Sequence, residues 1–139
     1  MNLSRANLQG IAEARLSDAS LLLIHRRFSS AYYLSGYAVE LALKACVSRQ
    51  FRQDEIPDKV LIKRVLTHQF PELVSLAGLA SELKGEQEVD PAFQANWGIV
   101  NEWESDSRYD MIDAISAQQM LKAIADDQHG VMQWIRRHW

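Results

Sequence analysis

Residues 31–45 read AYYLSGYAVELALKA and form the most apolar helical segment of the chain. Glu40 and Lys44 are its only charged side chains, and apolar or small residues fill most of its other positions. A helix that is apolar almost all round packs in the centre of a protein, against neighbours on several sides. We therefore predict a central helix over about residues 31–51, with one of the two serines before Ala31 as its N-cap.

Helical periodicity continues on both sides of this stretch. Apolar residues between positions 3 and 27 recur every three to four residues, which predicts a long first helix capped by Asn2 or Ser4. The polar residues 84–90 predict an exposed loop or a fraying helix end. Two short helices are expected next, one over residues 59–66 with Asp58 as its cap and one that begins at Thr67. Two further helices are expected, over residues 91–103 with Asp90 as cap and over residues 116–138 with Ser116 as cap. Gly130 predicts a kink in the last of them.

The sequence contains no convincing strand. Its six glycines and three prolines are too few for the turns of an all-β sandwich. We expect an all-α protein, an up-and-down bundle of four to five helices with short helices in the middle. The 139 residues fit one domain over residues 1–139.

Composition excludes several classes of protein. The 15 basic and 18 acidic side chains give a net charge of −3, so no global positive field attracts nucleic acid. The charge is uneven, +4 over residues 1–68 and −7 over residues 82–113, which indicates solvated helix faces or a polarised surface that orients a charged partner. The single cysteine, Cys46, excludes an intramolecular disulfide, and no apolar run approaches the roughly 18 residues of a membrane span. We expect a soluble, cytoplasmic protein without membrane contact.

Glu40 and Lys44 are the first candidates for a site. A carboxylate within an apolar helix is costly unless it is paired. Lys44 lies four residues further along the same helix, and Arg108 is the other candidate partner. The pair is either a structural ion pair or part of a binding site.

Arg108, Tyr109 and His68 are the other candidates. An arginine beside Trp103 and Tyr109 can stack on an aromatic ring or bind phosphate through two parallel hydrogen bonds, unless it is simply a surface arginine paired with a glutamate. His68 follows Thr67 at a helix start, where an imidazole can act as acid or base, or merely cap the helix. The histidines lack metal-ligand spacing, so no metal and no cofactor are expected.

Residues 29–49, SSAYYLSGYAVELALKACVSR, resemble the second helix of HEPN domains. The order of the surrounding elements fits as well, including Thr67-His68 at a short helix, a Trp-rich helix, the Arg108-Tyr109 pair and a long closing helix. The resemblance implies a bundle of four or five helices, similar to the substrate-binding domain of kanamycin nucleotidyltransferase. It also implies side-by-side homodimers and occurrence beside minimal nucleotidyltransferases.

Many HEPN domains are metal-independent ribonucleases with an Arg, four to six intervening residues and a His. In those members, both side chains stand at the dimer cleft around the scissile phosphate. The nearest pair in this chain, Arg64 and His68, has only three residues between its members. The ribonuclease signature is therefore absent in its usual form.

Three functions follow as hypotheses. The first is a non-catalytic HEPN-like module that binds a nucleotide, a nucleic acid such as RNA, or a nucleotidyltransferase-type partner in a toxin–antitoxin or defence-type system. Its site would be Glu40, Lys44, Arg108 and Tyr109, with Arg108 and Lys44 on a phosphate or acidic partner. The second is a ribonuclease with His68 as acid or base and Arg64 or Arg108 at the phosphate. The third is a structural dimer, with an interface formed by the apolar second helix, Trp134 and Trp139.

Overall fold

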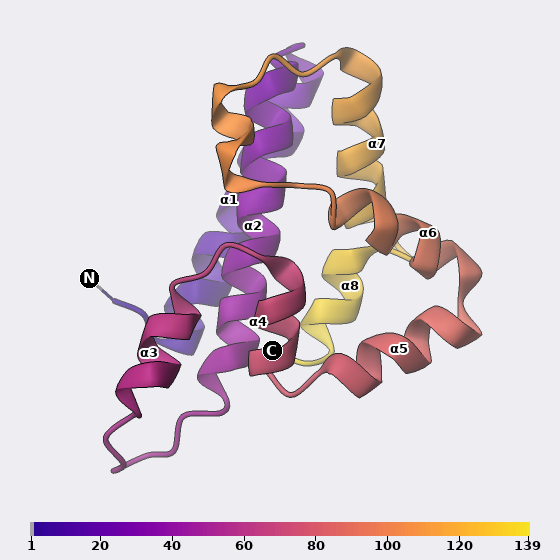
Figure 1. Cartoon of the computed structure of the whole chain (residues 1–139). Coiled ribbons are helices and arrows are strands. Elements are labelled where there is room, and N and C mark those ends of the chain that lie inside the picture. Colours follow the sequence, from indigo (N-terminus) through magenta and orange to yellow (C-terminus); the bar gives the residue numbers. More distant parts are fainter. Residues whose placement is uncertain (1) are drawn as a thin grey trace.

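The computed structural model describes residues 2–139, and every regular element within them is helical (Figure 1). This confirms the all-α prediction with short helices in the middle, although the described chain divides into more helices than the four to five expected. The elements are α1 (Arg5–Ile24), α2 (Phe28–Ser48), α3 (Lys59–Val65), α4 (Phe70–Leu76), α5 (Ala80–Val89), α6 (Pro91–Val100), the 3-10 helix η1 (Ser105–Tyr109), α7 (Ala114–Ala125) and α8 (Val131–Arg136).

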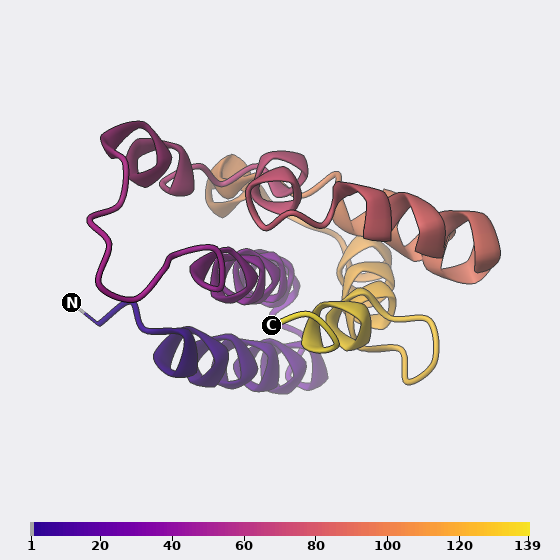
Figure 2. The same ribbon diagram turned by 90° about the horizontal axis from the view of Figure 1, so that it is seen from below.

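The predicted central helix is α2. It lies antiparallel to α1, and α4, α7, α8 and η1 also pack on it (Figures 1 and 2). Twelve of its 21 residues are buried. The predicted serine cap is wrong, because α2 begins at Phe28 and both serines lie in its first turn. The hydroxyl of Ser29 instead accepts a hydrogen bond from the backbone N–H of Ile112, at 2.9 Å, which ties α2 to the segment after η1.

Most of the predicted caps depend on local chemistry and are confirmed. Ser4, Asp58 and Asp90 each accept a hydrogen bond from a backbone N–H in the first turn of α1, α3 and α6, respectively. The cap of α7 is an exception, because Asp113 accepts a hydrogen bond from the N–H of Ser116. Ser116 therefore donates to the cap and lies inside the helix.

Two predicted boundaries differ from the structure. Of the two alternatives for residues 84–90 the loop is wrong, because residues 84–89 form the end of α5, and their glutamate, glutamine and lysine side chains are good helix formers. The helix expected from Thr67 begins only at Phe70, since the Thr67 hydroxyl accepts from the N–H of Gln69 and holds a turn before the helix.

The long closing helix expected over residues 116–138 is divided into α7 and α8. Asp126 ends α7, because its carboxylate accepts hydrogen bonds from the N–H groups of Gln128 and His129. At Gly130 an added Cβ would lie 2.4 Å from the backbone oxygen of Asp126, so a glycine is required there. The predicted kink is therefore a complete break.

Much of the interface expected for a structural dimer lies in the core of this chain. Trp134 is 1% exposed and packs against Phe93 and Trp97. The apolar side chains of α2 likewise belong to the core, and Trp139 packs partly buried against it. The fully buried residues among them stabilise the fold and are not free to bind a second chain, whereas Trp139 and the tyrosines of α2 are only half-buried.

The break between α7 and α8 is held to α6 by an ion pair. His129 Nδ1 lies 2.7 Å from Asp90 Oδ2, while the other oxygen of Asp90 caps α6. The hydrogen bond to Asp90 raises the pKa of His129 above its usual 6.5, and the same bond lowers the pKa of Asp90 below its usual 3.8. The pair therefore stabilises the fold fully between about pH 4 and 6.5. Its contribution is lost as the pH rises through the raised pKa of His129 or falls through the lowered pKa of Asp90.

Replacing His129 by glutamine is expected to lower stability most at pH 5 to 6. The difference in the free energy of unfolding between the variant and the parent protein should shrink towards pH 9, where His129 is neutral in both the folded and the unfolded chain. Urea unfolding of the two proteins at both pH values measures the effect. A difference that is constant with pH would contradict this role of the pair.

Candidate functional site

Glu40 is the most deeply buried charged side chain of α2, at 1% exposure. Its Oε1 accepts from Lys44 Nζ at 2.9 Å and also lies 2.6 Å from His68 Nδ1. The sequence left open whether Glu40 pairs with Lys44 or with Arg108, and the structure shows that its partner is Lys44. His68 joins them from the connection between α3 and α4, and so fixes this connection to α2.

This arrangement orients the His68 imidazole. Because Nδ1 faces the carboxylate, Nε2 is the ring nitrogen left for other partners, and the side chain is 55% exposed. A histidine oriented in this way can donate or accept a proton at Nε2. Glu40 Oε2 is buried and has no hydrogen-bond partner within the described part of the chain.

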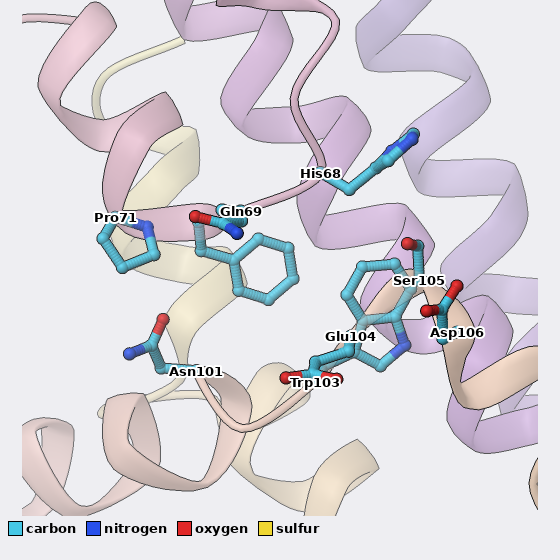
Figure 3. Close-up of a pocket in the computed structure, with 9 residues that line it drawn as sticks. His68, Gln69, Pro71, Asn101, Trp103, Glu104, Ser105 and Asp106 are labelled. Carbon is cyan, nitrogen blue, oxygen red and sulfur yellow. The ribbon is translucent and has the colours of Figure 1, made fainter.

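His68 also lies at the edge of a pocket of about 390 Å³ (Figure 3). Trp103 forms one wall, stacked on Phe70 with ring centroids 5.3 Å apart. The indole Nε1 is buried and unpartnered among residues 2–139. The rim carries two carboxylates, Glu104 and Asp106, and the lining described by the structure includes no lysine or arginine. This charge disfavours a phosphate in the His68 pocket.

A second pocket, of about 300 Å³, lies at the N-terminal end of α2. We call it the Arg108 pocket. It is lined by Ser29, Ser30, Tyr33 and Leu34 of α2, by Ser107 and Arg108 of η1, and by Asp110. The Arg108 guanidinium lies over the Tyr109 ring, 4.8 Å from its centroid. Its ion pair with Asp106 is long, at 3.9 Å, and exposed, which leaves the guanidinium available to an anion.

Several features of the Arg108 pocket suit an anionic group. The first backbone N–H groups of a helix lack intrahelical partners and carry partial positive charge. Ser107 is 6% exposed, and its hydroxyl has no partner within residues 2–139. Interaction with the Tyr109 side chain, and less strongly with Tyr33, raises the pKa of Arg108 above its usual value, so the guanidinium stays charged. Tyr109 is 76% exposed and offers a free ring face.

The structure separates the other predicted site residues. Lys44 lies 11 residues beyond Tyr33 on α2, roughly 16 Å along the helix, so Lys44 and Arg108 do not meet at one point. Arg64 pairs with Glu72 at 3.4 Å, while His68 pairs with Glu40, and the predicted break between α3 and α4 lies between them. The geometry therefore does not unite Arg64 and His68.

Sequence reasoning missed several of these residues. Tyr33, Ser29 and Ser30 reach the Arg108 pocket only because η1 folds back on the first turns of α2. The Glu40–His68 contact joins residues 28 positions apart. No local pattern in the sequence encodes either approach.

Other chemistries have little support in the described residues. Burial raises the pKa of the Cys46 thiol to about 12, so it is a poor nucleophile. No three His, Cys, Asp or Glu side chains within residues 2–139 gather as a metal site requires. None of the described helices is long and apolar enough to span a bilayer.

Comparison with known proteins identifies the family. The HEPN domain model matches residues 7–138, nearly the whole chain, which confirms the resemblance seen at residues 29–49. No curated protein and no solved structure gives a significant match. The family match agrees with the all-helical order of the structure, and on this basis the chain belongs to the HEPN domain family.

Proposed function

We propose that this chain is a non-catalytic HEPN module that binds a nucleotide or a nucleic acid at the Arg108 pocket. Arg108 binds the phosphate there, together with the hydroxyl groups at the start of α2, and Tyr109 stacks on the base. Lys44 and Glu40 act elsewhere, by fixing His68 and the connection between α3 and α4 to α2.

One observation carries this proposal. The charged Arg108 faces a pocket that also holds the first turn of α2 and the buried, unpartnered hydroxyl of Ser107. Arginine binds phosphate through two parallel hydrogen bonds, and a helix N-terminus favours the same charge. The larger His68 pocket carries two carboxylates and no lysine or arginine among its described lining residues, whereas the Arg108 pocket holds one carboxylate, Asp110, beside the guanidinium. Of the two pockets, the smaller one therefore fits a phosphate.

The resemblance to HEPN domains that occur beside nucleotidyltransferases supports a wider setting. We propose a homodimer with a nucleotidyltransferase-type partner, in a toxin–antitoxin or defence-type system. Co-expression with a minimal nucleotidyltransferase of the kind that occurs beside HEPN domains, followed by size-exclusion chromatography, tests that setting. A chain that stays monomeric and alone would contradict it.

Replacing Arg108 by alanine is expected to weaken binding of nucleoside monophosphates by about 10- to 100-fold, because a hydrogen-bonded charge pair contributes about 1.5–3 kcal/mol. Tyr109→Ala should weaken it by about tenfold through lost stacking. Isothermal titration calorimetry with AMP, GMP, CMP and UMP measures both effects. The unphosphorylated nucleosides are titrated in parallel to isolate the contribution of the phosphate.

Arg15→Ala is the matched control, because Arg15 is also a partly exposed arginine paired with an aspartate, but it lies on α1. It should leave the affinity unchanged. Equal affinity of the Arg108→Ala and Arg15→Ala proteins would refute the site. Equal binding of nucleosides and nucleotides would refute the phosphate contact.

The Glu40–His68 pair favours a second candidate, a metal-independent ribonuclease. A carboxylate 2.6 Å from Nδ1 leaves Nε2 oriented as an acid or base, a role that contributes about 10²–10⁴-fold in rate. Arg64 does not serve as the phosphate-binding group in this arrangement, since it is paired with Glu72.

Incubation of the purified chain with total RNA and a chelator tests this candidate. If the ribonuclease activity exists, His68→Ala should abolish cleavage and Arg15→Ala should not. Absence of cleavage by the parent protein is the result that the binding proposal expects. Cleavage that survives in His68→Ala protein would assign it to a contaminant or to another residue.

A further inference from the structure

The helix α3 has no buried residue, unlike α1, α2 or α4. It stands at the edge of the molecule beside the C-terminal end of α2, after the long connection that follows α2 (Figures 1 and 2). Its apolar side chains Val60, Ile62 and Leu66 are 62%, 48% and 65% exposed, and Ile56 just before it is 97% exposed. Clustered exposure of this kind indicates a surface that another molecule covers.

Two of these side chains, Ile62 and Leu66, line a groove of about 290 Å³. Its apolar lining is Leu3 before α1, Leu8 in α1, Phe51 after α2, and Ile62, Val65 and Leu66 from α3 and its end. Lys44 also lines the groove, and its ammonium is paired with Glu40. We call this surface the α3 groove. It takes apolar side chains, because its walls offer few groups that form hydrogen bonds.

The edge of the α3 groove is positively charged. Lys59 and Lys63 on α3 and Arg5 on α1 form no ion pair among the residues that the structure describes. Arg5 lines a hollow that shares Leu3 and Phe51 with the groove. The carboxylates close to them in the sequence are Asp54, Asp58, which caps α3, and Glu55, which is paired with Arg52. The edge therefore carries an excess of unpaired cations.

We propose that the α3 groove docks an amphipathic helix of a partner protein, with an apolar stripe flanked by acidic side chains. The stripe enters the groove with side chains spaced three or four residues apart, as helices in grooves do. The flanking carboxylates meet Lys59, Lys63 and Arg5. Burial supplies the affinity, and the charges supply selectivity and a faster encounter.

A second copy of this chain fits the groove less well. In a two-fold symmetric dimer the same surface is used by both subunits, so the interface would contain two copies each of Lys59, Lys63 and Arg5. Like charges placed together across an interface disfavour association. The charge pattern therefore selects an acidic partner.

The α3 groove is independent of the Arg108 pocket. The groove lies at the C-terminal end of α2, beside Ser48, and the pocket lies at its N-terminal end, beside Ser30. The two positions are roughly 27 Å apart along the helix. A partner in the groove leaves the pocket open, so the two proposals succeed or fail separately.

The test uses two synthetic helical peptides that share a leucine stripe at positions i, i+3 and i+7. One carries glutamates beside the stripe and the other carries lysines. Fluorescence anisotropy with the full chain should show the glutamate peptide binding at least about tenfold more tightly, because several weak ion pairs act together. Lys59→Glu/Lys63→Glu should reverse this preference.

Leu66→Asp is expected to weaken binding of the glutamate peptide by at least about tenfold, because it places a charge in the apolar groove. Ile115→Asp is its control, an equally exposed apolar residue at 66% on α7. Circular dichroism confirms that each variant is folded, and Leu66→Asp should leave nucleotide affinity unchanged.

Equal binding of the two peptides overturns the proposal, as does binding unaffected by Leu66→Asp. A dimer that Leu66→Asp dissociates, with no peptide binding, would assign the groove to a second copy.

Discussion

Replacing Lys44 by methionine is expected to lower the free energy of unfolding by about 2–4 kcal/mol. Methionine keeps most of the aliphatic packing of the lysine stem, so the loss reports on charge. The variant leaves the Glu40 carboxylate, 1% exposed, with His68 as its remaining partner. A buried carboxylate without adequate compensation is among the costliest groups in a folded protein.

Replacing Glu40 by leucine is expected to cost less, about 1 kcal/mol, although it removes the centre of the same cluster. Lys44 and His68 are 17% and 55% exposed, so both can turn to water once the carboxylate is gone. Urea unfolding of the two single variants measures the order. A larger loss for Glu40→Leu than for Lys44→Met would contradict this account of the cluster.

Replacing Gly36 by alanine is expected to lower the free energy of unfolding by about 1–3 kcal/mol. An added Cβ would lie 2.2 Å from the indole ring of Trp103. The ring is held between Phe70 and Tyr33 and has little freedom to move. Displacing Trp103 would also disturb the wall of the His68 pocket.

Gly10→Ala provides a matched control inside a different helix. An added Cβ at Gly10 meets nothing within 4 Å, and this glycine is exposed on α1. Alanine should therefore stabilise the protein by about 0.5–1 kcal/mol through its better helix propensity. Thermal unfolding followed by circular dichroism separates the two substitutions. If both substitutions shifted the unfolding temperature in the same direction, the close approach of Trp103 to Gly36 of α2 would be contradicted.

Local chemistry explains which parts of the fold could be predicted. The burial of α2 follows from its composition, and the caps at Asp58 and Asp90 need only a carboxylate beside a helix start. The break at Asp126 was missed, because its two hydrogen bonds to the following turn compete with a helical pattern that reads as continuous. Local propensity cannot decide that competition.

The candidate site was predictable only in its separate parts. Arg108, Tyr109, Glu40 and Lys44 are recognisable as residue types in unusual places, but their grouping depends on how η1 and the α3–α4 connection fold against α2. The pairing of Glu40 with His68 is such a tertiary contact. The exposed apolar face of α3 also emerges only from the fold, since the sequence predicts a short helix there but not which of its residues are buried.

The most direct test of the central claim is a titration of the ¹⁵N-labelled chain with a nucleoside monophosphate, followed by NMR. We expect saturable chemical-shift changes of the Ser29 and Ser30 backbone amides and of the Arg108 side-chain N–H. Residues around His68 in the other pocket should change little. Shifts confined to the His68 pocket, or an absence of saturable shifts, would contradict the proposal that the Arg108 pocket binds the phosphate.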